Sequence, residues 1–186
     1  MKTAIIAAAA AAALLSACSS MPTGAAAPIA AAAVDQAAPA AMDYVRMAGA
    51  SDLYEINSSK IALEKAQRPE VKRYAQMLID HHQTTTAATM AAARKAGMTP
   101  PPPALDAGVT ASLAELQNAA PGDFDRLYLA QQVPAHQAAI DLHRSYGTGG
   151  DQPALRSSAN KAVPVVRQHL TDAQRMMKAT AKSGSM

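Results

Sequence analysis

Residues 121–146 read PGDFDRLYLAQQVPAHQAAIDLHRSY. Apolar side chains recur in this stretch with the 3.6-residue period of an amphipathic α-helix. Pro121-Gly122 marks the start of the helical segment. The pattern predicts a helix to about Tyr146, with Asp123 as its N-cap. Its buried stripe mixes titratable groups with apolar ones: Phe124, Asp125, Tyr128, Leu129, Gln132, Val133, His136, Ile140 and His143.

Three further segments show the same helical period. They run from about Met42 to Ala66, from Glu70 to Ala96, and from a cap at Asp151 to about Met176. Gly97 is predicted to end the second segment, and residues 147–150 are predicted to form a turn before the last. Each segment carries one titratable group near the middle of its stripe: Glu55, His82 and His169.

The connection between the second segment and residues 121–146 is rich in proline. Met98 to Ala104 contains four consecutive prolines, which predict an extended crossover, and Val109 to Asn118 predicts a short extra helix. The chain has no tryptophan and only one phenylalanine, which favours closely packed helices over a β-sandwich. The fold class expected from these features is all-α, an up-down four-helix bundle over residues 42–180.

The first residues predict export rather than fold. Lys2 precedes an apolar run from Ile5 to Leu15, and the sequence Leu-Ser-Ala-Cys ending at Cys18 resembles the bacterial lipobox, which is cleaved before a cysteine that is then acylated. We therefore expect a lipoprotein signal peptide in residues 1–18, lipidation of Cys18 and a flexible Ala/Pro-rich tether in residues 19–41. Ser19 is the residue type that directs such lipoproteins to the outer membrane. The alternative is an ordinary secretory signal cut later, which would leave a soluble periplasmic or secreted protein.

The charge composition indicates which classes of binding partner to expect. Removal of residues 1–18 leaves 16 basic and 14 acidic residues, scattered along the chain, so no nucleic-acid surface is expected. The expected partner is the membrane, through the lipid anchor, and the sequence identifies no protein partner. With a single cysteine, Cys18, no intrachain disulfide can form.

Several short motifs together resemble a known family. They are Glu55-Ile56, His82 after an apolar run, Phe124-Asp125-Arg126-Leu127-Tyr128 with Gln132-Val133 and His136, and Leu155 with Val163-Pro164 and His169-Leu170. The chain from about Asp43 to Met177 resembles the bacterial domain-of-unknown-function family numbered forty-one forty-two, predicted outer-membrane proteins of the ferritin-like superfamily. The resemblance implies a ferritin-like four-helix bundle and an exported protein. One departure is His81, because the family often has Asp directly before the histidine of the second helix.

Ferritin-like di-iron sites take a Glu from each of two helices and a Glu-x-x-His pair from each of the other two. In this chain the positions three residues before the stripe histidines hold Ile79, Val133 and Val166. Because the bridging carboxylates are missing, the sequence argues against a di-iron centre and against ferroxidase or di-iron oxygenase chemistry.

The groups that remain form a candidate metal site. Glu55, His82, His136 and His169 each lie near the middle of a helix, so we expect them to converge at one level of the bundle. Asp125 is a candidate to support a ligand from outside the site. The nitrogen-rich set suits zinc or copper better than magnesium or calcium. His81, rotated about 100° from His82, and His143, two turns beyond His136, are expected to lie outside the ligand set.

The sequence is compatible with three functions. The first is a non-enzymatic, envelope-anchored bundle with a polar or metal-binding core, serving in stress tolerance or metal handling. The second is a metalloenzyme in which three histidines leave a coordination position open. The third is a structural or interaction module of the envelope. Without metal, the same side chains would form a hydrogen-bonded layer, in which Glu55 accepts from ring nitrogens and Tyr128 or Gln132 completes the network.

Overall fold

The computed structural model describes residues 37–183, with side chains to residue 179. The predicted signal peptide, Cys18 and residues 19–36 of the predicted tether lie outside this range. The described residues form five helices: α1 (Ala41–Lys65), α2 (Pro69–Lys95), α3 (Ala107–Asn118), α4 (Pro121–Gly149) and α5 (Pro153–Ser183).

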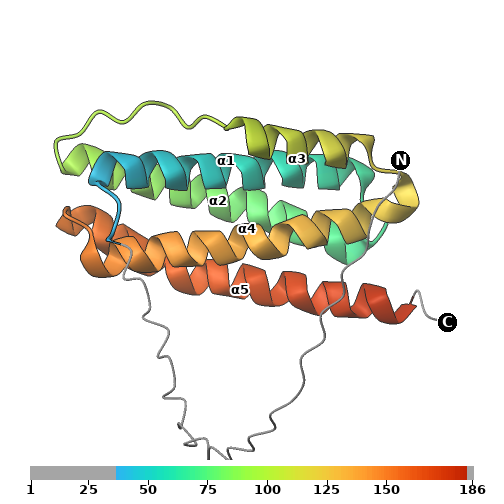
Figure 1. Cartoon of the computed structure of the whole chain (residues 1–186). Helices are drawn as coiled ribbons and strands as arrows, with labels where there is room; N and C mark the ends of the chain where they lie inside the picture. Colours follow the sequence, from blue (N-terminus) through green and yellow to red (C-terminus); the bar gives the residue numbers. More distant parts are fainter. Residues whose placement is uncertain (1–36, 184–186) are drawn as a thin grey trace, which may run out of the picture. The chain divides into compact units, whose positions relative to one another are not determined.

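Helices α1, α2, α4 and α5 form the bundle, and α3 lies along its outside (Figure 1). Short turns join α1 to α2 and α4 to α5 as antiparallel pairs, while α1 also packs on α4, α2 on α5, and α3 on α1 and α4. The extended segment after α2 returns along the bundle, so α2 and α4 run in the same direction (Figure 1). The predicted ferritin-like up-down bundle, with its proline-rich crossover and extra helix, is confirmed.

Two glycines shape the proline-rich crossover: Gly97 ends the helix before it, and Gly49 of α1 leaves room for it to pack. Gly97 has a positive φ of 77°, and the bonds from Gly97 N to Arg94 O and from Met98 N to Ala93 O close the helix end. The predicted cap at Gly97 is therefore confirmed. Farther along, a Cβ on Gly49 of α1 would stand 3.2 Å from Pro103 Cγ, so the missing side chain lets the crossover lie close against α1.

Three predicted boundaries are wrong: the start of α4, its end, and the end of α5, which continues to Ser183 and not only to about Met176. Asp123 is not the N-cap of α4: the cap is Ala120, without a side-chain bond, and Asp123 pairs with Arg126 in the first turn. Pro121 at the first helical position explains this start, because its fixed φ suits the helix. Residues 147–150 are not a turn either, since α4 continues to Gly149. The Asp151 carboxylate accepts a hydrogen bond from the Tyr146 hydroxyl across the short link to α5.

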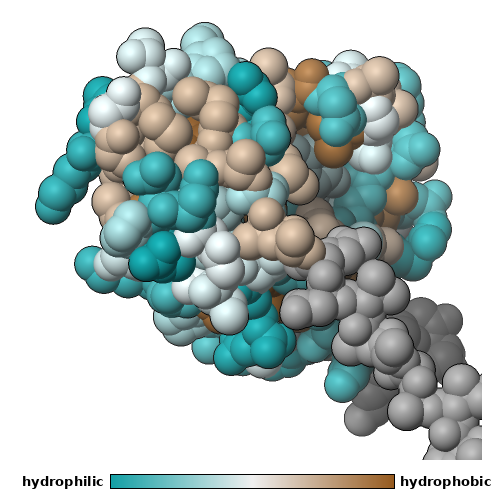
Figure 2. Space-filling view, turned by 60° about the vertical axis from the view of Figure 1, so that its left-hand side comes forward, coloured by the Kyte–Doolittle hydropathy of each residue, from teal (hydrophilic) through white to brown (hydrophobic). Residues whose placement is uncertain are grey.

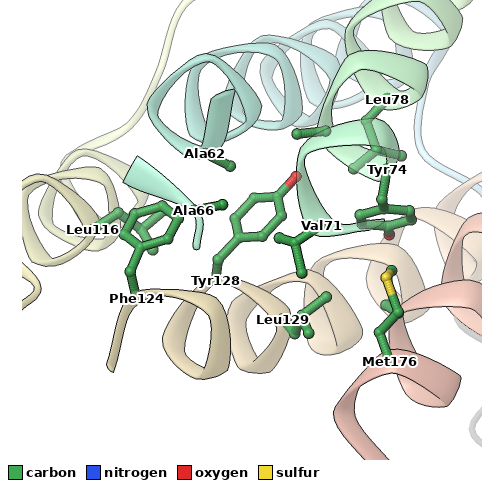
Figure 3. Packing of buried hydrophobic residues seen from close by; sticks show 12 residues of the cluster. Ala62, Ala66, Val71, Tyr74, Leu78, Leu116, Phe124, Tyr128, Leu129 and Met176 are labelled. Atoms are coloured by element: carbon green, nitrogen blue, oxygen red, sulfur yellow. The ribbon is translucent and has the colours of Figure 1, made fainter. Parts of the chain in front are cut away.

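The core consists of three apolar clusters, two large and one small, and a polar layer lies between the two large ones. The small cluster is formed by Ala139 and Ile140 of α4 and Val166 of α5. Figure 3 shows the larger cluster, where Phe124 and Tyr128 of α4 pack against α1, α2, α3 and α5 near the α1–α2 turn. The second cluster, around Tyr44, Tyr146 and Leu155, lies toward the opposite end of the helices. Between them the buried side chains are largely polar: Asp52, Glu55, Ser58, Ser59, His82, Gln132, His136, His143 and His169.

The surface is mixed in character. The face in Figure 2 combines hydrophilic residues with weakly apolar ones, as expected of an alanine-rich chain, and Met47 is a large apolar side chain that is 52% exposed. Within residues 37–183, none of the helices has the length and apolar character needed to cross a membrane.

Candidate metal centre

Three histidines from three helices meet in the polar layer. His82 of α2, His136 of α4 and His169 of α5 each offer a ligand atom, and these atoms all lie within 4.8 Å of one another. Their ring centroids are 5.3 to 5.8 Å apart, and the residues are only 1–2% exposed. The structure thus brings together histidines that the sequence places on separate helices.

Each of the three rings has one nitrogen engaged in a hydrogen bond. His82 Nδ1 lies 2.7 Å from Asp52 Oδ1, and His136 Nδ1 lies 2.8 Å from the Gln132 carbonyl oxygen. Both partners are acceptors, so both Nδ1 atoms donate. The third ring uses its other nitrogen, with His169 Nε2 2.8 Å from His81 Nδ1.

The second nitrogen of each ring is buried and has no hydrogen-bond partner among the described protein atoms. These atoms are His82 Nε2, His136 Nε2 and His169 Nδ1. In a neutral imidazole whose Nδ1 donates, Nε2 carries the lone pair that binds a metal. His82 and His136 are therefore held in the tautomer in which Nε2 can bind a metal. His82 is held there by the Asp52 carboxylate, and a carboxylate often accepts the other N–H of a metal-binding histidine in this way.

Glu55 of α1 lies beside the three histidines but is not within the group whose ligand atoms are all within 4.8 Å of one another. Its Oε1 lies 3.8 Å from His136 Nδ1, the residue is 1% exposed, and neither carboxylate oxygen has a described hydrogen-bond partner. Gln132 Oε1 is also buried and has no hydrogen-bond partner among the described residues. Buried polar atoms without partners are costly, and six of them in one layer point to a site that needs a further group.

The hydrogen-bonded layer that the sequence allowed is different from what the structure shows. Tyr128 bonds to Ser59 at 2.8 Å, and Gln132 Nε2 donates to Ser58 at 3.2 Å, so both side chains are used elsewhere. Neither of these bonds satisfies Glu55 or the free ring nitrogens. The polar layer is thus incomplete as a network of protein groups alone.

Electrostatics differ between the rings. Burial lowers the pKa of His82, but the hydrogen bond to Asp52 and the charges of Glu55 and Asp52 outweigh it, so the pKa is raised above 6.5. For His169, burial and then the neighbouring histidines lower the pKa to about 2, so this ring is neutral at physiological pH. A cation at the cluster would take the place of the proton that His82 attracts.

The donor set fits a transition metal. Imidazole nitrogens bind zinc at about 2.0–2.1 Å, which places ligand nitrogens roughly 3.5 Å apart, so the rings need only a small inward shift from separations within 4.8 Å. Three imidazoles with a carboxylate suit copper or zinc, whereas magnesium and calcium prefer oxygen. The cluster is therefore able to hold such an ion.

Asp52 is the functional residue that the sequence reasoning missed. It accepts hydrogen bonds from His82 Nδ1, from Thr85 at 3.1 Å and from Thr86 at 2.8 Å, and is 5% exposed. The signal was present, because an aspartate on the buried stripe one turn before Glu55 needs a partner.

His81 is not one of the three clustered histidines. It nevertheless bonds to one of them, His169, and stacks on it, with ring centroids 5.1 Å apart and 20° between the planes. The rotation of about 100° turns His81 toward the neighbouring α5 instead of away from the site. Asp125 does not support a ligand: its two oxygens accept from the backbone N–H groups of Gln67 and Arg68, each at 2.9 Å.

His143 lies outside the cluster of three histidines. Its Nδ1 is 3.0 Å from the Tyr44 hydroxyl, and burial lowers its pKa below 6.5. It is buried like the other three and belongs to the same helix as His136, so it is a suitable control for them.

Comparisons with known proteins give a family and a fold. Residues 26–176 match the family model described as a domain of unknown function, DUF4142. Among proteins of curated function, none matches the chain. Similar solved structures include CopM in the Cu(I)-bound form (19% identity, TM-score 0.65, covering 76% of this chain and 97% of that chain).

Two more solved structures share the fold. CopM in the apo form has 18% identity and a TM-score of 0.64, and covers 76% of this chain and 98% of that chain. A DUF305 fragment from Deinococcus radiodurans has 16% identity and a TM-score of 0.67, and covers 77% of this chain and 98% of that chain. At these identities the likeness shows the helical bundle alone.

Proposed function

The chain belongs to the DUF4142 family, a domain of unknown function, and we propose that its bundle binds one copper or zinc ion in the core and serves in metal handling rather than catalysis. The observation that carries the proposal is the cluster of three buried histidines from α2, α4 and α5, in which one ring nitrogen of each lies within 4.8 Å of the others and each ring has one buried nitrogen without a hydrogen-bond partner. Glu55 is the candidate fourth ligand.

The charge of the site favours a divalent ion. Asp52 and Glu55 are 5% and 1% exposed, and two carboxylates in a medium of low polarity attract a doubly charged cation more strongly than a singly charged one. The cluster of His82, His136 and His169 contains no sulfur ligand, which also favours Zn(II) or Cu(II) over the softer Cu(I).

The fold is compatible with copper binding. CopM, which shares the bundle, has been solved in Cu(I)-bound, Cu(II)-bound and Ag-bound forms. This supports copper as one ion to test, although the ligands of this chain are argued from its own residues. The near-complete burial of the three histidines favours holding an ion over the open coordination position of a metalloenzyme.

Metal analysis of the full chain, purified without a polyhistidine tag, tests the proposal. After loading with excess Zn(II) or Cu(II) and desalting, the protein is expected to retain one ion per chain. His82→Gln, His136→Gln and His169→Gln should each lose most of it, because each removes one of the three nitrogens.

His143→Gln is the matched control, since it removes a buried histidine outside the cluster and should retain the ion. Circular dichroism should show all four variants folded. If the wild type retained no ion, or if His143→Gln and His136→Gln lost it equally, the core site would be excluded.

We further propose that the protein is an envelope lipoprotein anchored in the outer membrane through Cys18. The support is the lipobox-like sequence ending at Cys18, directly after an apolar run. Diacylation gives stable membrane attachment. Cys18→Ser should leave an unprocessed precursor and abolish acylation by labelled palmitate. Normal processing of Cys18→Ser, together with a wild type that takes up no labelled palmitate, would support the soluble periplasmic or secreted alternative.

A further inference from the structure

The buried cluster has a histidine at its outer edge. His81 is exposed on α2, and its Nδ1 lies 2.8 Å from Nε2 of His169, which is 1% exposed. The two rings stack with their centroids 5.1 Å apart. The pair therefore joins the surface of the bundle to its core between α2 and α5.

His169 has two nitrogens in different surroundings. Nε2 contacts the exposed ring of His81, whereas Nδ1 is buried and unpartnered, and the ring lies 5.3 Å from those of both His82 and His136. One side chain can thus bind an ion on either side. An exposed partner such as His81 is free to swing outward and let solvent reach it.

We propose that His81 Nδ1 and His169 Nε2 form an outer loading site, through which a divalent transition-metal ion enters and leaves the core cluster. The inference rests on the proposed metal-binding function. A hydrated ion must lose its waters before it enters a dry site, and two imidazoles can replace water one ligand at a time. The ring that carries the proton between the two nitrogens loses it to solvent and takes up a proton on its other nitrogen, so both rings stay neutral and both facing nitrogens offer a lone pair to the ion.

Transfer inward follows from the same geometry. When His169 releases the ion from Nε2, that nitrogen takes up a proton and Nδ1 loses its own, so Nδ1 can bind the ion together with His82 Nε2 and His136 Nε2, the other two unpartnered nitrogens. His81 is not one of the three core ligands, so it should govern how fast the ion moves and not how tightly it is finally held.

Stopped-flow kinetics with the full chain and Zn(II) test this role. Capture of Zn(II) from a chromogenic chelator and release to it are measured for the wild type and for His81→Gln, and the dissociation constant is measured separately at equilibrium. In His81→Gln both rates should fall by at least about 10-fold, with less than about a threefold change in affinity and one ion still bound. His143→Gln should keep both rates.

Each outcome has a distinct meaning. Unchanged rates in His81→Gln would overturn the loading site and leave the core site standing. Weaker affinity at an unchanged capture rate would also overturn it, because His81 would then only orient His169. A wild type that binds no Zn(II) and no Cu(II) would overturn the proposed function, and the loading site with it.

Discussion

Asp52 shows how a single side chain prepares the candidate site. It accepts hydrogen bonds from His82, Thr85 and Thr86, so its carboxylate is held on two sides while it orients the His82 ring. A carboxylate behind a histidine fixes the tautomer and makes the other nitrogen a better metal ligand. Asp52 would thus act through His82 and not by touching the ion.

Asp52→Asn is expected to lower the affinity for Zn(II) by about 10- to 100-fold, because the amide can accept from His82 Nδ1 but carries no charge. Chelator competition measures the change. Asp43→Asn is the control, since Asp43 is an exposed α1 residue paired with Arg46, and its affinity should equal that of the wild type. Equal affinities for both variants would remove Asp52 from the site.

His169 should make the metal-free protein sensitive to acid. Burial first, and then the neighbouring histidines, lower the pKa of His169 to about 2. Below the ordinary pKa of 6.5 the unfolded chain therefore binds a proton that the native His169 ring does not bind. The contribution of His169 to stability is present above pH 6.5 and is lost as the pH falls toward 2.

When the pH is lowered from about 7 to about 4.5, His169 should reduce the unfolding free energy of the wild type by about 1–3 kcal/mol. The His169→Gln variant lacks this group and should not show that part of the decrease. Urea denaturation with a metal chelator present measures both proteins at both pH values. His82, whose pKa is raised, titrates in the opposite sense and is present in both, so the difference isolates His169. Equal losses would contradict the argument.

At the scale of elements, the turn between α1 and α2 is held by a residue of a third helix. Asp125 of α4 accepts from the N–H groups of Gln67 and of Arg68, the N-cap residue of α2. A negative charge at a helix N-terminus is also favourable. Asp125 thereby ties both α1 and α2 to α4, which explains an aspartate on a buried stripe.

Asp125→Ala should therefore destabilise the bundle by about 1–3 kcal/mol, because two backbone donors lose a charged acceptor. Its neighbour Asp123 offers a control: it is an exposed partner of Arg126, so Asp123→Ala should change stability by less than about 1 kcal/mol. Chemical denaturation measures both. Zn(II) stoichiometry should stay at one ion in either variant, and its loss in Asp125→Ala alone would restore Asp125 to the site.

At the scale of the whole molecule, the polar layer opposes the stability of the bundle. The apolar clusters stabilise the fold, but between the two large ones Glu55 and the three histidines place unpartnered atoms in the interior. Such groups cost free energy in the metal-free protein, and an ion that binds only the native state would return it.

Glu55→Leu should consequently stabilise the metal-free protein by about 1–3 kcal/mol and weaken Zn(II) binding. The same change at Glu64, which is exposed on α1, should alter stability by no more than about 0.5 kcal/mol and leave binding unchanged. Thermal and urea unfolding, with and without Zn(II), provide the measurements. A marked loss of stability in metal-free Glu55→Leu would show that Glu55 belongs to a satisfied hydrogen-bond network instead.

The sequence alone determined the helices and the level of the site. Helical periodicity located the five helices to within a few residues except at the end of α5, which continues to Ser183 instead of stopping at about Met176. Gly97 marked the end of α2, and the proline run marked the crossover. The histidines could be assigned to buried stripes because burial follows from the 3.6-residue repeat, which is local information. Mid-helix positions in an antiparallel bundle then had to lie at similar heights.

The tertiary structure alone decided which polar groups touch. The pairs His82–Asp52 and His169–His81, and the role of Asp125 at the α1–α2 turn, depend on the rotation and axial position of one helix against another. One residue of offset turns a side chain by about 100°, so periodicity places a residue near the core without choosing its neighbour helix. That choice comes from packing across α1, α2, α4 and α5, because contacts between residues far apart in the chain are not encoded in any local repeat.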